Sequence, residues 1–223
     1  MSRILITGTS SGIGLAAAKK FLAMGHEVYG IDVQPSAIED VSYHHFIADV
    51  SEKESLPNVE GVEYLFSNAG VQGKDEIKVN LIGSMNVVEK YAFNPHIKSV
   101  LINASSSAHT GFEFAEYSAS KAGLLGYTKN VAWRLAKAYK ATCNSVSFGG
   151  VVTPLNNEVM DDKASWDAIM DVTPLKKWVS LEEAAEWIYF LTVINKSASG
   201  QDVLIDNGEK DLNCTFVWPG FDK

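Results

Sequence analysis

Short apolar runs alternate with longer segments of helical periodicity along most of the chain. Runs typical of strands buried on both faces of a parallel sheet occur at residues 3–7, 27–32, 44–48, 62–67, 98–103, 141–147 and 202–205. Apolar residues at helical spacing occupy segments between them, at 12–24, 75–93, 115–139 and 181–194. This alternation predicts an α/β fold, a doubly wound parallel sheet of about seven strands with helices on both faces.

The chain is expected to form a single domain over residues 1–223, because it contains no repeat, no low-complexity segment and no Pro/Gly-rich linker. Two segments depart from the regular pattern. Residues 150–180 have a mixed pattern, and their apolar side chains either cover a substrate or pack onto the sheet. Residues 207–223 form a tail in which Phe216 and Trp218 are predicted to pack against a second subunit or against the 150–180 segment.

The charge and the cysteines exclude several classes of function. The net charge is -8, from 19 basic and 27 acidic residues, and no cluster of Lys or Arg indicates a nucleic-acid partner. No apolar run approaches the length of about 18 residues that spans a bilayer. The first strand begins too close to Met1 to leave room for a signal peptide, so a cytoplasmic protein without a membrane partner is expected. Cys143 and Cys214 lack the spacing of a metal or redox site, so no metal is expected.

A glycine-rich turn at residues 7–14 joins the first strand to the first helix. Without Cβ atoms, the backbone N–H groups of such a turn can approach a pyrophosphate, which the positive end of the helix also attracts. The turn residues expected to bind the phosphates are Gly8, Ser10, Ser11, Gly12, Ile13 and Gly14. The alternative is a turn that serves only to pack the helix against the strand.

Asp32 ends the second strand, where a carboxylate can accept hydrogen bonds from both ribose hydroxyls of an adenosine and repel a 2′-phosphate. No Arg or Lys lies in the turn or immediately after Asp32 to neutralise such a phosphate. These observations favour NAD over NADP as the cofactor. The alternative is a solvated carboxylate at the end of a strand.

Tyr117 and Lys121 share one face at the start of the longest predicted helix. A free phenol has a pKa near ~10 and is a poor base at neutral pH, and lowering that value to ~7 requires about 4 kcal/mol. A neighbouring ammonium group supplies part of this stabilisation. The phenolate can then accept the proton of an alcohol as hydride leaves. Taken alone, the pair is more typical of two surface side chains.

Together these features resemble the short-chain dehydrogenase/reductase family. The matching residues are the turn at 7–14, Asn68-Ala69-Gly70 after the fourth strand, the serines at 105–107 after the fifth, and Tyr117-x-x-x-Lys121. Their order and location match as well, and the resemblance covers nearly the whole chain. It implies a Rossmann-type fold, a nicotinamide cofactor and a Ser–Tyr–Lys mechanism, usually with an assisting Asn.

The resemblance implies a catalytic set of Asn80, Ser106, Tyr117 and Lys121. Tyr117 would be the acid/base, and Lys121 would hold the nicotinamide ribose and lower the pKa of Tyr117. The serine would hydrogen-bond the substrate oxygen. Asn80 would position a water that links to Lys121, although Asn80 could also be a surface amide of its helix.

Further residues would bind the cofactor. The resemblance assigns them as Asp49 and Val50 at the adenine, Asn68, Ala69 and Gly70 along the cofactor, and Thr153 at the nicotinamide carboxamide, with Tyr117 and Lys121 contributing. Asp49 could instead cap a helix, and Thr153 could be a turn residue before Pro154.

The chain departs from the family pattern at the serine and at Phe148. Counting from Asn103, the pattern Asn-x-Ser-Ser selects Ser106, with Ser105 as the fallback. Counting back from Tyr117 selects Ala104, which cannot serve, so a shortened loop at 107–116 is inferred. Phe148-Gly149 stands where the family commonly has Pro-Gly.

The sequence thus predicts an NAD-dependent oxidoreductase that acts on a hydrophobic secondary alcohol or ketone and assembles as a homo-oligomer, a dimer or a tetramer. Two alternatives stay open. One is an NADPH-dependent reductase of 3-oxoacyl type, and the other is a non-catalytic NAD-binding sensor or scaffold on the same fold.

Overall fold

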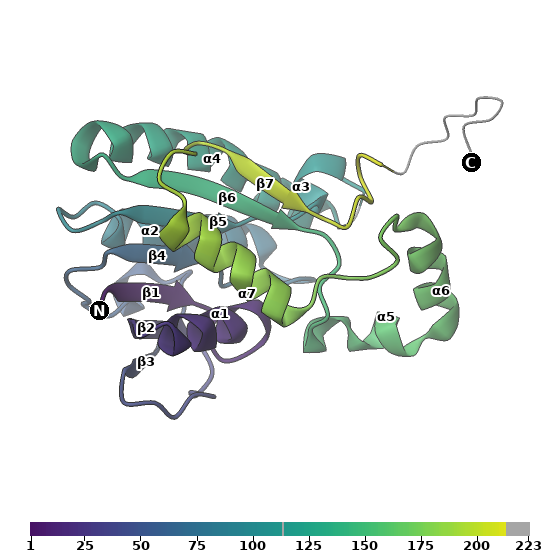
Figure 1. Ribbon diagram of the computed structural model, residues 1–223, viewed down its shortest axis with the longest axis horizontal. Helices are drawn as coiled ribbons and strands as arrows, with labels where there is room; N and C mark the ends of the chain where they lie inside the picture. The colour runs from purple at the N-terminus through teal and green to yellow at the C-terminus, as the bar shows by residue number, and fades with distance from the viewer. Residues whose placement is uncertain (113, 213–223) are drawn as a thin grey trace.

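Seven parallel strands form the centre of the molecule in the computed structural model, which describes residues 1–112 and 114–212 (Figure 1). The strands are β1 (Arg3–Thr7), β2 (Glu27–Asp32), β3 (Tyr43–Ile47), β4 (Tyr64–Ser67), β5 (Ser99–Asn103), β6 (Thr142–Phe148) and β7 (Asp202–Ile205). Their order in the sheet is β3-β2-β1-β4-β5-β6-β7. The sequence prediction of one doubly wound, seven-stranded parallel sheet is therefore confirmed.

The connections between the strands contain helices of very different lengths. The α-helices are α1 (Gly12–Ala23), α2 (Ser84–Tyr91), α3 (Ser107–Thr110), α4 (Ala115–Tyr139), α5 (Asn157–Asp161), α6 (Lys163–Val172) and α7 (Leu181–Tyr189). The shorter turns of helix are η1 (Lys53–Ser55), η2 (Ile77–Gly83), η3 (Pro154–Asn156) and η4 (Phe190–Ile194). Of these, η2 and η4 are π-helical, and they lie directly before α2 and after α7.

The sheet is covered on both faces, and each face has its own apolar core. Helices α1 and α7 lie in front of the sheet in Figure 1, where Phe21 and Ile188 pack against Ile4 and Ile6 of β1. Helices α2 and α4 cover the other face, where Val88 and Leu135 belong to the same core. Because β1 is buried on both faces, alternate residues of one strand supply the two cores.

Two strand connections lack a long helix. Residues 33–42, between β2 and β3, form no helix, and residues 48–63, between β3 and β4, contain only the short turn η1. Leu56 and Val62 of the second connection are buried in the core beside α2 and α4. With Ala48 and Val50 also buried there, this short stretch covers the part of the sheet that a helix would otherwise occupy.

The mixed pattern at 150–180 conceals two helices, α5 and α6, which lie beyond the carboxyl ends of the strands at the right of Figure 1. Neither helix contains a fully buried residue, but Trp166, Ile169 and Met170 of α6 follow helical spacing and are partly buried, so α6 has a short apolar face that the sequence analysis did not assign to a helix. Helix α6 begins at a cap in which the side chain of Asp162 accepts a hydrogen bond from the backbone N–H of Ser165. The tail residues Phe216 and Trp218 lie outside the described residues.

Helix α1 approaches β1 and β4 so closely that Gly14 has no room for a side chain. A Cβ at this position would collide with the carbonyl oxygen of Gly8 and would lie 2.6 Å from Nδ2 of Asn68. Both neighbours are fixed, because Asn68 Nδ2 also donates to the carbonyl oxygen of Thr7 at 3.0 Å. The absence of a Cβ at Gly14 therefore sets the distance between α1 and the sheet.

We predict that Gly14→Ala lowers the free energy of unfolding by about 3 kcal/mol, because a methyl group is forced against backbone that cannot move. Gly126→Ala is the matched control on α4, since nothing lies within 4 Å of its Cβ position. The control should be neutral or more stable by about 0.5–1 kcal/mol. Denaturant unfolding of the two variants measures both values, and a Gly14→Ala variant as stable as the wild type would contradict the account.

Candidate active site

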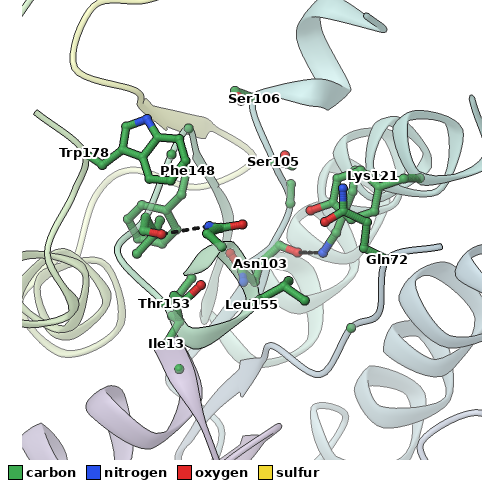
Figure 2. Close-up of a pocket in the computed structure, with 18 of the residues that line it drawn as sticks. Ile13, Gln72, Asn103, Ser105, Ser106, Lys121, Phe148, Thr153, Leu155 and Trp178 are labelled. Carbon is green, nitrogen blue, oxygen red and sulfur yellow. Dashed lines mark hydrogen bonds between the residues drawn. The ribbon is translucent and has the colours of Figure 1, made fainter. Parts of the chain in front are cut away.

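A cavity of about 530 Å³ opens at the carboxyl ends of the strands. The loops that follow β1, β4, β5 and β6 and the beginning of α4 contribute its walls (Figure 2). In an open parallel sheet, ligands bind at this edge, at the point where the strand order reverses. Here the reversal lies between β1 and β4, and residues from both following loops, Gly8 and Asn68 among them, line the cavity.

The glycine-rich turn forms one wall of this cavity. Gly8 and Gly12 have φ angles of +77° and +50°, the left-handed region that favours glycine. Ser11, Gly12 and Ile13 line the cavity, and Ser11 precedes α1 without making a side-chain cap. The first N–H groups of α1 are therefore not used by a capping side chain, and an anion can bind there.

Asp32 is fastened to the same turn. Its carboxylate accepts hydrogen bonds from the backbone N–H groups of Ser10 and Gln34, each at 2.9 Å. The Ser10 hydroxyl donates in turn to the carbonyl oxygen of Gln34 at 3.2 Å. The structure thus brings Asp32 and Ser10 together next to the turn, although neither side chain lines the 530 Å³ cavity.

Asn68 and Ala69 hold the end of β4 against β1. Both backbone N–H groups donate to the buried hydroxyl of Thr7, each at 3.0 Å. Nδ2 of Asn103 donates to Oδ1 of Asn68 at 2.9 Å. The remaining side-chain oxygen, Asn103 Oδ1, is buried without a hydrogen-bond partner among the described residues, and Asn103 lines the cavity.

Tyr117 and Lys121 lie in the first two turns of α4 and both line the cavity. Nζ of Lys121 lies 5.7 Å from the centroid of the Tyr117 ring and donates to the carbonyl oxygen of Asn103 at 2.9 Å (Figure 2). Lys121 is only 4% exposed. Because burial penalises the charged form, the pKa of Lys121 falls from 10.5 to about 8.

Asn80 lies buried in η2, next to the same lysine. Its side chain forms two hydrogen bonds with the backbone of Val71, accepting from N–H at 2.7 Å and donating to the carbonyl oxygen at 3.0 Å. It also donates to the Ser120 hydroxyl at 3.2 Å. A Cβ on Gly70 would lie 3.0 Å from Asn80 Oδ1 and 3.5 Å from Lys121 Nζ. The structure therefore gathers Gly70, Asn80 and Lys121 at one point, and Asn80 is not a surface amide.

Both candidate serines line the cavity, and they differ in their partners. The Ser105 hydroxyl donates to Ser107 Oγ at 3.1 Å and accepts from the N–H of Ser107 at 3.2 Å. The Ser106 hydroxyl has no hydrogen bond to any described residue, while its backbone N–H donates to the carbonyl oxygen of Phe148 at 2.9 Å. Figure 2 shows Ser105 between Asn103 and Ser106. Residues 107–110, expected as part of a shortened loop, form the short helix α3.

The remaining predicted cofactor residues are divided between two places. Thr153 lines the cavity, with its Cγ2 atom 3.8 Å from the Cβ position of Gly12. Asp49 and Val50 lie away from this cavity. The carboxylate of Asp49 accepts from the N–H of Ser51 at 2.8 Å, and Val50 packs against the Cα of Gly83.

Two further residues of the cavity wall are Trp178, which belongs to the 150–180 segment expected to cover a substrate, and Glu209, which sequence reasoning missed. Trp178 lies directly over Gly150, where any Cβ would overlap the indole ring, and its ring meets that of Trp166 edge to face at 5.0 Å. Glu209, in the turn after β7, also reaches the wall. The Gly149-Gly150 pair was the available signal for Trp178, since adjacent glycines mark a close approach. Nothing in the sequence pattern marked Glu209.

The described part of the chain contains no helix long and apolar enough to cross a membrane. Its His, Cys, Asp and Glu side chains do not gather in any group of three that could hold a metal ion. The cavity is thus built from glycines, amides, hydroxyls and aromatic rings, with Lys121 and Glu209 as its charged groups among the described residues.

We predict that Lys121→Met raises the free energy of unfolding at pH 7 by about 1–3 kcal/mol. Burial lowers the pKa of Lys121 from 10.5 to about 8, and keeping the lysine charged at pH 7 therefore destabilises the fold by about 3 kcal/mol. Methionine removes this destabilisation, but the variant also loses the hydrogen bond to Asn103, which makes the net gain in stability smaller. The gain should shrink as the pH rises from 8 to 10.5, since folded wild type then releases a proton that the unfolded chain retains.

Lys129→Met, at an exposed position of the same helix, is the control and should show no such pH-dependent difference. Urea unfolding of the wild type and both variants at several pH values measures the effect. A Lys121→Met variant that is less stable than the wild type at every pH would show that the lysine is not strained.

Comparison with known proteins supports the arrangement. A family model described as enoyl-(acyl carrier protein) reductase matches residues 8–210. The chain is 31% identical over 245 residues to the short chain dehydrogenase prhI of Penicillium brasilianum, covering 92% of this chain and 95% of the relative. It is equally similar, at 31% identity over 245 residues, with 92% and 94% covered, to the short chain dehydrogenase ausX of the same organism.

Solved structures show the same likeness. The structure of 4-hydroxyisoleucine dehydrogenase complexed with NADH matches with a TM-score of 0.83 and 26% identity, covering 94% of this chain and 99% of that one. A short chain dehydrogenase family protein from Francisella tularensis matches with a TM-score of 0.82 and 25% identity, covering 94% and 98%. The chain therefore belongs to the short-chain dehydrogenase/reductase family, whose members are Rossmann-fold oxidoreductases that use a nicotinamide cofactor.

Proposed function

We propose that this oxidoreductase transfers a hydride between NAD(H) and a secondary alcohol or its ketone, with Tyr117 as the acid/base. The observation that carries the proposal is the position of Tyr117 and Lys121, which line the same cavity as the glycine-rich turn. A dinucleotide-binding turn and a proton-transferring pair in one cavity are what hydride transfer from an alcohol requires.

The residues present fit a nicotinamide cofactor. Gly8 and Gly12 line the cavity with positive φ angles, and the first residues of α1, whose N–H groups are not used by a capping side chain, lie beside them. The cofactor would be held by the residues of the glycine-rich turn, by Asp32 and by residues 68–70. Thr153 and Lys121 would contact it as well, and Asp49 and Val50 would lie toward its adenine. When bound, it supplies a nicotinamide ring that accepts or donates the hydride.

Asp32 favours NAD over NADP. Its carboxylate is held rigidly against the turn by the N–H groups of Ser10 and Gln34. A carboxylate in that place accepts hydrogen bonds from ribose hydroxyls and repels a 2′-phosphate. No Lys or Arg occurs at 7–14 or at 33–42 to offset that repulsion. The similar 4-hydroxyisoleucine dehydrogenase is complexed with NADH, which agrees with this preference.

In the proposed mechanism Tyr117 receives the proton of the alcohol and returns it in the opposite direction. The positive charge of Lys121, near the Tyr117 ring and shielded from water, stabilises the phenolate through space. Asn103 and Asn80 position the lysine, the first by a hydrogen bond and the second through the loop at residues 70–71. Apolar side chains of the cavity wall, such as Leu155 and Trp178, exclude water from the reacting groups.

The partner contacts favour Ser106 as the serine that donates to the substrate oxygen. Its hydroxyl is not engaged by any described residue, whereas that of Ser105 is bonded to Ser107. The bond from Ser106 N–H to Phe148 fixes the backbone that carries this hydroxyl. A donor that is fixed before the reaction stabilises a developing alkoxide without reorganisation.

The assembly as a homo-oligomer and the cytoplasmic location stay predictions from the sequence. The single-domain organisation of the chain, with residues 150–180 as a segment that covers the substrate, also stays a prediction from the sequence. Leu155, Ile169, Val172 and Trp178 of that segment line the cavity, which supports the substrate-covering role over simple packing onto the sheet.

We expect Tyr117→Phe to lower turnover of a secondary alcohol at least about a thousandfold, because general acid–base catalysis contributes effects of this size. NADH affinity should change less than about threefold, since the aromatic ring is kept. Steady-state kinetics and an NADH titration measure the two quantities. Tyr139→Phe, at the other end of α4, is the control and should stay active. Full turnover by Tyr117→Phe would remove the tyrosine from the mechanism.

We expect Asp32→Asn to raise NADPH affinity relative to NADH affinity by about tenfold, because the charge that repels the 2′-phosphate is gone. The amide keeps one oxygen that can accept from Ser10 or Gln34, so the turn should stay in place. Competitive titration with the two nucleotides measures the ratio, and Glu39→Gln, at an exposed position of the loop after β2, controls for net charge. An unchanged ratio would show that Asp32 does not select the cofactor.

A further inference from the structure

Among the described residues, one carboxylate belongs to the cavity wall. Glu209 lies in the turn that follows β7 and lines the cavity together with Trp178, Phe148 and Gly149. Figure 2 shows Phe148 and Trp178 on the side of the cavity opposite Lys121. Glu209 is half-buried, so its charge is only partly screened by water.

The two oxygens of Glu209 have different surroundings. Oε1 lies 2.6 Å from the hydroxyl of Thr173, a fully buried residue at the end of α6. Oε2 lies 3.6 Å from the Cβ position of Gly149, and no described residue donates a hydrogen bond to it. One oxygen is therefore held by Thr173, and the other accepts no hydrogen bond from a described residue, in a side chain that belongs to the cavity wall.

The neighbouring Asp206 shows what a carboxylate with a purely structural role looks like in the same turn. Its two oxygens accept from the backbone N–H groups of Gly208 and Lys210, each at 2.9 Å. Asp206 is only 6% exposed. Both oxygens of Asp206 therefore accept hydrogen bonds within this turn, whereas Oε2 of Glu209 accepts none from a described residue.

The charge of Glu209 is not compensated within the cavity. Among the described residues that line it, Lys121 is the only cation, and its ammonium is committed to Asn103 and to the neighbourhood of Tyr117. A wholly apolar substrate would cover Oε2 with hydrocarbon, and burying a carboxylate oxygen without a hydrogen-bond donor is strongly unfavourable. The substrate must therefore bring a donor to this oxygen.

We propose that Glu209 is a specificity-determining residue, and that the substrate is an alcohol with a second hydrogen-bond donor, a hydroxyl or an ammonium, beyond the reacting carbon. This inference rests on the proposed function and narrows it from hydrophobic alcohols in general to alcohols that carry such a donor. The ring of Trp178, which lies over Gly150, supplies an apolar wall for the carbon skeleton between the two polar ends.

A structural role for Glu209 makes a different prediction. Its contact with Thr173 joins the end of α6 to the turn after β7. If holding these segments together were its whole purpose, removing the carboxylate would weaken the binding of every alcohol by the same factor. A recognition role weakens only those alcohols that carry the second donor.

The test uses three probes of similar shape: cyclohexanol, cyclohexane-1,4-diol and 4-aminocyclohexanol. Their dissociation constants are measured by calorimetry on the full chain carrying Tyr117→Phe and saturated with NAD, so that no turnover occurs. Hydrogen bonds to a charged group change affinity by about tenfold or more. The diol, the aminoalcohol or both should therefore bind at least about tenfold more tightly than cyclohexanol.

The same titrations are repeated with Glu209→Ala, Glu209→Gln and the control Glu158→Gln, an exposed carboxylate on α5. Glu209→Ala should abolish the preference and let cyclohexanol bind at least as tightly as before, because no carboxylate oxygen is then buried against its hydrocarbon. Glu209→Gln keeps an acceptor oxygen, so it should retain most of a preference for the diol and lose a preference for the aminoalcohol. The control should change nothing. If Glu209→Ala fails to fold, the same-sized Glu209→Gln still decides the aminoalcohol arm.

The inference is overturned if neither donor-bearing probe binds more tightly than cyclohexanol, or if the preference survives in Glu209→Ala. An equal loss for all three probes leaves Glu209 as a structural tether and also overturns it. Turnover of the same alcohols by the wild type with NAD is measured separately. If the wild type turns over none of the alcohols but the Glu209-dependent preference is present, the proposed hydride transfer is contradicted and the role of Glu209 is not. If the alcohols are turned over but the preference is absent, the role of Glu209 is contradicted and hydride transfer is not.

Discussion

The burial of one ammonium group is the constraint on which the site depends. Lys121 is almost fully buried at the wall of the cavity, and burial lowers the pKa of its ammonium group to about 8. The carbonyl oxygen of Asn103, at the end of β5, accepts its hydrogen bond. A buried charge that destabilises the fold is typical of a functional group, and under the proposed function Tyr117 is the group on which this charge acts.

The elements around the lysine are held by polar contacts at the ends of the strands. Asn103 also bonds Asn68, Asn68 bonds the backbone of β1 at Thr7, and Asn80 bonds the loop that passes Lys121. The glycine-rich turn is tied into the same set, because Gly8 and Gly14 leave room for the Asn68 amide. A change at the cofactor cradle is therefore expected to reach the lysine through fixed contacts and not through a flexible loop.

The alternation of strands and helices was sufficient to predict the sheet, and the bounds of α4 agree with the segment predicted at 115–139. Regular burial makes such elements visible in a sequence. Helices α5 and α6 contain no fully buried residue, and the short apolar face of α6, at Trp166, Ile169 and Met170, was not recognised within the mixed pattern of residues 150–180. Glu209 reaches the cavity through the path of the chain after β7, which no local pattern encodes. The residues of the family motifs were recognised because each motif stands at a fixed place relative to the ends of the predicted strands.

The expected substrate also changes when the cavity is considered as a whole. The apolar residues at 150–180 suggested a hydrophobic alcohol, and Leu155, Ile169 and Trp178 do line the cavity. The uncompensated carboxylate of Glu209 among them favours a substrate that is apolar in its skeleton and polar at both ends. An apolar wall sets the position of such a substrate, and a few polar groups set its orientation.

The most direct test of the account follows the hydride itself. The wild-type protein is incubated with equimolar NAD and NADP and with cyclohexanol and cyclohexane-1,4-diol that carry deuterium on the carbinol carbons, and the nucleotides are analysed by mass spectrometry. The account predicts deuterium in the reduced nicotinamide of the NAD pool, with little in the NADP pool. Deuterium in neither pool, or mainly in the NADP pool, would contradict it.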